Sequence, residues 1–249
     1  MEAIKRQIKF QVIDTKNAFI TFWSIIILVN LFLYVINGIA DFGSAGVSFS
    51  ASFNGSQEEF ISVASVHVIS IIIFIIVSSM VMYYETFPIA IGFSTTRKDF
   101  YIGVVVHNII LSLSMAIIQG GLMKLDGFII EAIGRNPLYE QLMFNTKEDS
   151  LLYIILMLFI IFLFCTSLFN LLGAALYRFT WKLWLVIGGI TMLASNIDVL
   201  VNPLRSLLPF ELVIEHSRLV WLSDMLIISV ILYIIAFFLI RKISIRSRG

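Results

Sequence analysis

Long runs of apolar residues dominate this chain and leave few folds open to it. A helix needs about 20 apolar residues to cross a hydrocarbon core of about 30 Å. Across the chain, 59% of residues are hydrophobic and 13% are charged, whereas soluble domains contain about 25% charged residues. The sequence therefore predicts an all-α integral membrane protein with six transmembrane helices. The predicted helices are Ala18–Ile39, Ile61–Tyr84, Phe100–Met123, Leu151–Tyr177, Leu183–Ile197 and Val220–Ile240.

The positions of the basic residues give these helices an orientation. Twelve of the 17 Lys and Arg residues fall in the two ends of the chain or in the loops on the same side as those ends. Because Lys and Arg are enriched on the cytoplasmic side of membrane proteins, both termini are expected to lie inside the cell. The longest loop on the outer side is expected between Lys124 and Ser150.

The residues before the first span mix apolar and basic side chains in a helical pattern. Ile4, Ile8 and Val12 recur every fourth residue, with Lys and Arg between them. This pattern is typical of an amphipathic helix in the membrane interface. We therefore expect an interfacial helix over residues 1–17 and a six-helix transmembrane domain over residues 18–249. A solvated basic tail is the alternative.

The central portions of the predicted spans contain no Asp, Glu, Lys or Arg. Ion-coupled transporters usually carry ionisable groups there. His67 and His107 are the only candidates for a proton relay or a metal ligand, and they lie in different spans with no carboxylate at ligand spacing. The ordinary expectation for such a histidine is a hydrogen bond across a helix interface.

The chain is expected to lack an ATP site. Gly38 and Gly43 have the separation of the glycines in a phosphate-binding loop, but no lysine follows the second one. We therefore expect no cofactor on this chain and no enzymatic activity. If ATP drives its work, a partner subunit must hydrolyse it.

A ridge of small residues runs along the third predicted span. Ser112, Ala116 and Gly120 are each four residues apart. Such a ridge allows two membrane helices to approach closely. It is expected to serve either packing within the subunit or a dimer contact.

The segment Phe87–Gly103, FPIAIGFSTTRKDFYIG, places a polar turn between two apolar runs. Pro88 can begin a short helical turn, because its missing N–H costs nothing there. A hydroxyl within Ser94–Thr96 can cap the next helix, with Asp99 in its first turn. A helical turn and a helix cap do not explain the apolar residues of ETFPIAIGF. We expect them to form an exposed docking surface on the inner side.

This segment resembles the cytoplasmic loop between the second and third helices of ABC-2-type transporter permeases. The resemblance rests on Tyr84–Pro88 followed by GFSTTRKDFYIG, in which a small residue precedes an Arg/Lys-Asp-Phe/Tyr start of the third helix. Six spans, inward termini, an amphipathic N-terminal helix and a broken outer segment between the last two spans agree with the same family.

The resemblance implies the transmembrane subunit of an ATP-driven exporter. Two such subunits, alike or paralogous, would pair and bind separate ATP-binding cassette subunits that hold ATP and Mg²⁺. The loop would be the coupling helix that contacts the ATPase. The residues carried over to that role are Glu85, Phe87, Pro88, Phe93, Arg97, Lys98 and Asp99.

The same resemblance implies a cargo and a location. The cargo would be hydrophobic or amphipathic, and small permeases of this type export antimicrobial and cytolytic peptides, phenol-soluble modulins among them. The membrane would be a bacterial plasma membrane, and nucleic acid is not an expected partner.

Two other hypotheses remain open at this point. An ATP-independent secondary transporter or channel would depend on His67 and His107 for coupling. A membrane immunity or sensor-accessory protein would protect the cell without measurable flux.

Overall fold

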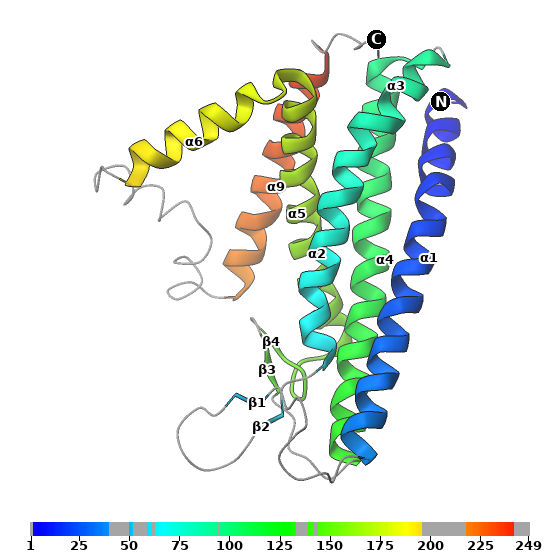
Figure 1. The fold of residues 1–249 in the computed structure, drawn as a ribbon, viewed down its shortest axis with the longest axis vertical. Helices are drawn as coiled ribbons and strands as arrows, with labels where there is room; N and C mark the ends of the chain where they lie inside the picture. The colour runs from blue at the N-terminus through cyan, green and yellow to red at the C-terminus, as the bar shows by residue number, and fades with distance from the viewer. Residues whose placement is uncertain are drawn as a thin grey trace. The chain divides into compact units, whose positions relative to one another are not determined.

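The computed structural model describes residues 2–39, 50–51, 59–60, 63–93, 95–132, 139–141, 144–195 and 218–241. Most of these residues are helical (Figure 1). The helices are α1 (Glu2–Ile39), α2 (Val63–Val81), the π-helical turn η1 (Met82–Thr86), α3 (Phe87–Gly92), α4 (Arg97–Ala132), α5 (Leu151–Phe179), α6 (Lys182–Ser195) and α9 (Arg218–Arg241). Two short antiparallel hairpins pair β1 (Ser50–Ala51) with β2 (Glu59–Phe60), and β3 (Glu140–Gln141) with β4 (Phe144–Asn145).

Five helical segments are long and apolar enough to cross a membrane. Their side chains leave large apolar surfaces exposed, as lipid-facing helices do; on α2, Ile69, Ile73 and Val77 form one such exposed stripe. The chain is therefore an all-α, multi-pass membrane protein. The five segments are Ile4–Val35, Ala64–Gly92, Arg97–Ala132, Leu151–Phe179 and Val220–Arg241.

The predicted span Leu183–Ile197 corresponds to α6, which has 14 residues. At 1.5 Å per residue this helix is about 21 Å long, shorter than the roughly 30 Å of hydrocarbon that a span must cross. A corner at Thr180, whose φ is 58°, turns α6 away from α5 (Figure 1). Residues 196–217 lie outside the described part of the chain, so the sixth span stays a prediction. The inward placement of both termini also stays a prediction.

The chain forms two compact units, and α1, α2, α4 and α5 each contribute to both. Unit 1 contains residues 1–11, 75–112 and 160–249, and unit 2 contains residues 12–74 and 113–159. The expected boundary at residue 17 is not marked in the secondary structure, since α1 runs without a break from Glu2 to Ile39. Its first eleven residues belong to the unit that contains α3.

In unit 2, polar side chains tie the beginning of α2 to α4. Gln119 Nε2 donates to the Ala64 carbonyl at 2.6 Å, and the Ala64 N–H donates to Asp126 Oδ2 at 3.3 Å. The first N–H groups of a helix lack intrahelical partners and favour negative charge. Asp126 therefore acts as a long-range cap for α2. The sequence placed this residue in an outer loop beginning at Lys124, whereas α4 continues to Ala132.

Candidate functional site

The short helix predicted at Pro88 is present. It is α3, and Pro88 lies in its first turn, where the missing N–H is tolerated. The π-helical turn η1 joins α2 directly to α3. The second candidate span, Ala64–Gly92, therefore ends in α3 as continuous helix.

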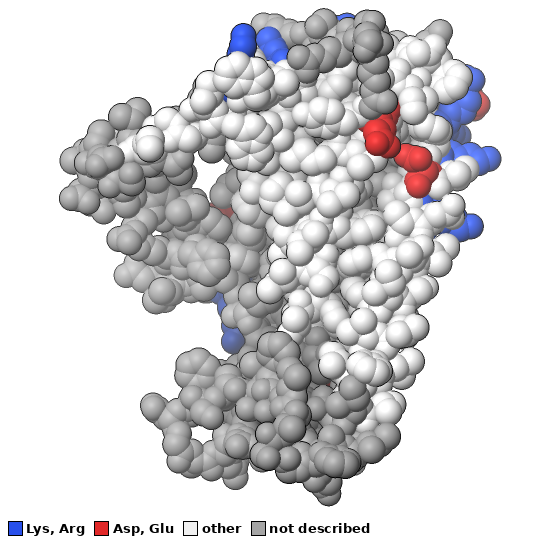
Figure 2. All heavy atoms as spheres, in the orientation of Figure 1, with Lys and Arg blue, Asp and Glu red and all other residues white. Residues whose placement is uncertain are grey.

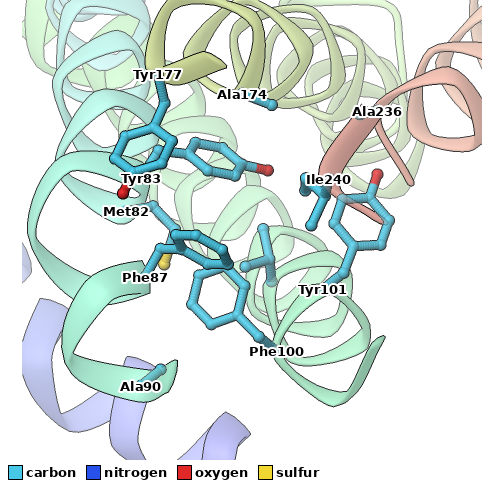
Figure 3. Close-up of a cluster of buried hydrophobic side chains, with 11 residues drawn as sticks. Met82, Tyr83, Phe87, Ala90, Phe100, Tyr101, Ala174, Tyr177, Ala236 and Ile240 are labelled. Atoms are coloured by element: carbon cyan, nitrogen blue, oxygen red, sulfur yellow. The ribbon is translucent and has the colours of Figure 1, made fainter. Parts of the chain in front are cut away.

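The inner face of α3 is buried in an aromatic cluster of unit 1. Phe87 is 0% exposed, and its ring centroid lies 5.0 Å from that of Phe100 and 5.5 Å from that of Tyr177. Figure 3 shows the Phe87 and Phe100 rings side by side, below Tyr83 and Tyr177. The aromatic cluster thus connects α3 to α4, α5 and α9. Its members are Met82, Tyr83, Phe87, Ala90, Phe100, Tyr101, Val104, Ala174, Tyr177, Ala236 and Ile240.

This burial corrects one expectation from the sequence. The apolar residues around Pro88 were expected to be exposed, but Phe87 and Ala90 are buried at 0% and 2% exposure. Ile89 and Phe93, at 49% and 78%, are the exposed apolar side chains of this helix and the residue after it. The physical reason is helical phase, because residues three apart share one face and the residues between them lie on the other. We call Ile89 and Phe93 the outer face of α3.

The predicted cap of the next helix is also present. Thr96 Oγ1 accepts a hydrogen bond from the Asp99 N–H at 3.1 Å and donates one to Asp99 Oδ2 at 2.7 Å. The Thr96 hydroxyl therefore caps α4, and the Asp99 carboxylate holds this hydroxyl in place. Ser94, the other candidate cap, lies outside the described residues.

The charged coupling candidates differ in how they are held. Arg97 Nη1 donates to the Arg241 carbonyl at 3.0 Å, which places a cation at the C-terminal end of α9, where the helix dipole favours it. Lys98 and Glu85 are exposed. On the face shown in Figure 2, most Lys and Arg side chains gather at the end that carries the N-terminus and α3.

A close helix contact lies directly beside this element. The Tyr83 hydroxyl donates to Asn170 Oδ1 at 3.0 Å. A Cβ added to Gly173 would lie 2.9 Å from Tyr83 Cδ2 and 3.0 Å from the Ser79 carbonyl oxygen. The absence of a side chain at Gly173 thus lets α5 approach the backbone of α2. Sequence analysis missed this glycine, although its spacing of three residues from Asn170 places both on one helix face.

The first turns of α1 border the same region. Gln7 and Gln11 are 5% and 0% exposed, and a Cβ built on Gly103 would lie 2.8 Å from Gln7 Cγ. On the apolar face, which was expected to lie in the membrane interface, Val12 is 38% exposed. Gln7 and Gln11 therefore pack this segment against α4, and its apolar side chains are partly exposed. Sequence analysis missed both glutamines.

An apolar groove of about 500 Å³ lies in unit 1 between α4, α5 and α9. Val105, Ile109 and Ile234 are typical of its lining. Its few polar groups are bonded within the protein, since the Tyr101 hydroxyl donates to the Tyr233 carbonyl at 2.6 Å and the Ser229 hydroxyl to a carbonyl of its own helix at 2.7 Å. Such a surface offers hydrocarbon contact and no hydrogen bonds.

The two histidines are placed in different units. His67 Nε2 lies 2.7 Å from Asn30 Oδ1, a hydrogen bond between α2 and α1 in unit 2. This is the contact across a helix interface expected for His67. His107 is buried in unit 1 at 3% exposure. Among the described residues, no group of three or more side chains could hold a metal ion.

The small-residue ridge is buried within the chain. Ser112 and Ala116 are both 0% exposed, and a Cβ on Gly120 would lie 2.9 Å from Ile155 Cγ1 of α5. Of its two possible roles, packing inside the subunit is the one that this burial favours.

No family model, curated protein or solved structure matches this chain. The likeness of Tyr84–Gly103 to ABC-2-type permeases therefore rests on the segment itself.

Proposed function

We propose that this chain is the transmembrane subunit of an ATP-driven exporter of the ABC-2 type. The observation that carries the proposal is the two-sided helix α3. Its inner face is fixed in the aromatic cluster, and its outer face, Ile89 and Phe93, is exposed. A short helix with this arrangement fits a docking element for a partner on the cytoplasmic side.

The contacts of α3 suit it to transmit a movement as well as to bind. A push on the outer face reaches α4 through Phe87 and Phe100, and reaches α5 through Phe87 and Tyr177. Close-packed interiors transmit strain because they contain little free space. The N-terminal turn of α1 borders the same element and would move with it.

The partner in this proposal is an ATP-binding cassette subunit. It would carry ATP and Mg²⁺, and two copies of it would bind two permease subunits, alike or paralogous. Glu85, Lys98 and the outer face of α3 are exposed and would meet the ATPase directly. Phe87, Pro88, Arg97 and Asp99 would hold the element in shape.

The proposed cargo is a hydrophobic or amphipathic peptide, exported across a bacterial plasma membrane. The groove between α4, α5 and α9 supports this class, because its polar atoms are already bonded and its lining is apolar. A cargo with many unpaired hydrogen-bond donors would find few partners there.

Purification of the tagged chain from its own cells in mild detergent tests the proposal. The test variant is Ile89→Ser with Phe93→Ala, which alters only exposed side chains. The matched control is Phe128→Ala, an aromatic residue of α4 that is 67% exposed. The co-purified partner is identified by mass spectrometry of its proteolytic fragments and by its ATP hydrolysis.

We expect the ATPase to accompany the wild type and Phe128→Ala, and to be lost by roughly tenfold or more from the double variant, since exposed aromatic anchors carry much of an interface's energy. Peptide export should fall in parallel. Equal recovery of the ATPase with all three proteins would contradict a docking role for α3.

A further inference from the structure

A polar pocket of about 250 Å³ lies in unit 1 beside α3. Its wall combines charged, amide and hydroxyl groups with two exposed aromatic rings. The residues that line it are Arg6, Gln7, Phe10, Ala90, Phe93, Thr95, Thr96 and Asp99. Neither the aromatic cluster nor the outer face of α3 accounts for these polar groups.

One buried donor in this wall has no acceptor. Gln7 is 5% exposed, and within the described part of the chain its Nε2 makes no hydrogen bond. Buried polar groups are nearly always paired, and an unpaired one indicates an unseen partner or a cost that is kept for function. Gln7 also lines the pocket, so a turn of its side-chain amide would bring this enclosed donor to a ligand oxygen.

The other donors of the pocket favour a negatively charged ligand. Arg6 contributes a guanidinium, whose planar fork of N–H groups matches phosphate oxygens. The pocket also adjoins the first turn of α4, where the helix dipole attracts anions. Among the described residues that line the pocket, Asp99 is the only acidic one, and its carboxylate already accepts a hydrogen bond from Thr96.

The position of the pocket identifies the class of ligand. Three candidate spans have an end at this pocket, since they begin at Ile4, end at Gly92 and begin at Arg97. The ends of spans lie at the level of the lipid headgroups. Phe10 and Phe93, which are 36% and 78% exposed, offer apolar contact beside the polar groups.

We propose that this pocket binds the phosphate of a phospholipid headgroup. Arg6 and Gln7 donate to the phosphate oxygens, and Phe10 and Phe93 contact the glycerol and the first acyl carbons. The pocket shares Phe93 with the outer face of α3, but Arg6 and Gln7 are not part of that face, so the proposal stands whether or not the chain is an exporter subunit.

Native mass spectrometry of the full-length chain, released from detergent micelles that contain dioleoyl phosphatidylglycerol, tests the site. The variants are Arg6→Gln, which removes the charge, and Gln7→Leu, which removes the unpaired donor. The control is Arg178→Gln, an exposed arginine near the corner between α5 and α6 that is not part of the pocket lining. Thermal unfolding of each protein checks that it is folded.

We expect the wild type and Arg178→Gln to retain one more lipid than Arg6→Gln, with an apparent affinity roughly tenfold higher, as for the loss of one charge-assisted hydrogen bond. Gln7→Leu should also bind more weakly, while unfolding at the same or a higher temperature. Equal retention by the wild type and Arg6→Gln would overturn the proposal.

Two further measurements test whether the site recognises the lipid phosphate, and not the acyl chains alone or free phosphate. Dioleoylglycerol has the same acyl chains without phosphate, and its retention at the level of phosphatidylglycerol would also overturn the proposal. Inorganic phosphate at millimolar concentration should leave the lipid bound. If it displaces the lipid, the site recognises free phosphate and not a lipid.

Discussion

A close contact between α2 and α5 gives a sharp test of the packing in unit 1. A Cβ on Gly173 would meet Tyr83 Cδ2 at 2.9 Å and the Ser79 carbonyl oxygen at 3.0 Å. Tyr83 is fully buried and held by its bond to Asn170, and the carbonyl belongs to helix backbone. Neither atom can yield without moving one helix relative to the other. Gly173→Ala should therefore separate α2 and α5 beside the aromatic cluster.

The expected loss of stability combines one stabilising and two destabilising contributions. Alanine in place of a helical glycine stabilises by about 1 kcal/mol, and overpacking a tight site costs about 1–3 kcal/mol. If Tyr83 moves off Asn170, a buried acceptor is left unpaired at a further cost of about 1–3 kcal/mol. The net effect is a destabilisation of roughly 1–5 kcal/mol.

Two other glycines provide matched controls. A Cβ on Gly121 of α4 would meet nothing within 4 Å, and a Cβ on Gly120 would meet only the Ile155 side chain within 3 Å. Gly121→Ala should therefore stabilise by up to about 1 kcal/mol through helix propensity. Gly120→Ala should fall between Gly121→Ala and Gly173→Ala, because Ile155 can change rotamer.

The only cysteine of the chain supplies the assay. Cys165 lies in α5 and is partly buried, so a fluorogenic maleimide reports unfolding as the protein is heated in detergent. For a chain of this size, 1 kcal/mol corresponds to a shift of about 2–4 °C in the midpoint. Gly173→Ala should lower the midpoint and Gly121→Ala should raise it. A Gly173→Ala midpoint at or above the wild-type value would refute the close contact.

The same assay checks two features of the helix ends. Thr180 has a positive φ of 58°, which is rare for a β-branched residue. Thr180→Gly should therefore raise the unfolding midpoint by the equivalent of about 1 kcal/mol. Thr180→Ala keeps a Cβ and should change the midpoint little, and equal shifts for the two variants would argue against backbone strain. Thr96→Val removes both hydrogen bonds of the Thr96 cap and should cost about 0.5–2 kcal/mol. Thr95→Val is its control, because Thr95 takes no part in these two bonds, and the cap is disproved if the two variants unfold together.

The sequence predicted the cap of α4 correctly because its partners are close neighbours in the chain. Thr96 and Asp99 are three residues apart, and their bonds form within one turn. Asp126 is the opposite case. A carboxylate after an apolar run indicates the end of a span, yet α4 continues past it because Asp126 finds the N–H of Ala64, 62 residues away. No local pattern contains that partner.

The packing of the N-terminal segment on α4 could not be predicted from the sequence for a different reason. Its apolar spacing identified Ile4, Ile8 and Val12 as one face, which was expected to lie in the membrane interface, whereas in a soluble protein that face would be the buried one. Lipid is as apolar as the protein interior, so burial of this face within the protein brings no advantage in a membrane. Gln7 and Gln11 pack on α4 instead, at the position where Gly103 leaves room for them.

Helix α3 shows that residue type alone does not separate the buried from the exposed residues of the proposed coupling site. By composition, Phe87 and Phe93 are equivalent, but six positions along a helix turn them to different faces, and their exposures are 0% and 78%. Phe87→Ala would empty a buried site and cost about 3–5 kcal/mol, so it would abolish transport in any membrane protein with this core. Phe93 and Ile89 are exposed, so changing them separates a docking defect from a folding defect. Loss of the partner on changing those two residues, with the unfolding midpoint unchanged, is therefore the result that distinguishes a coupling helix from a capped turn.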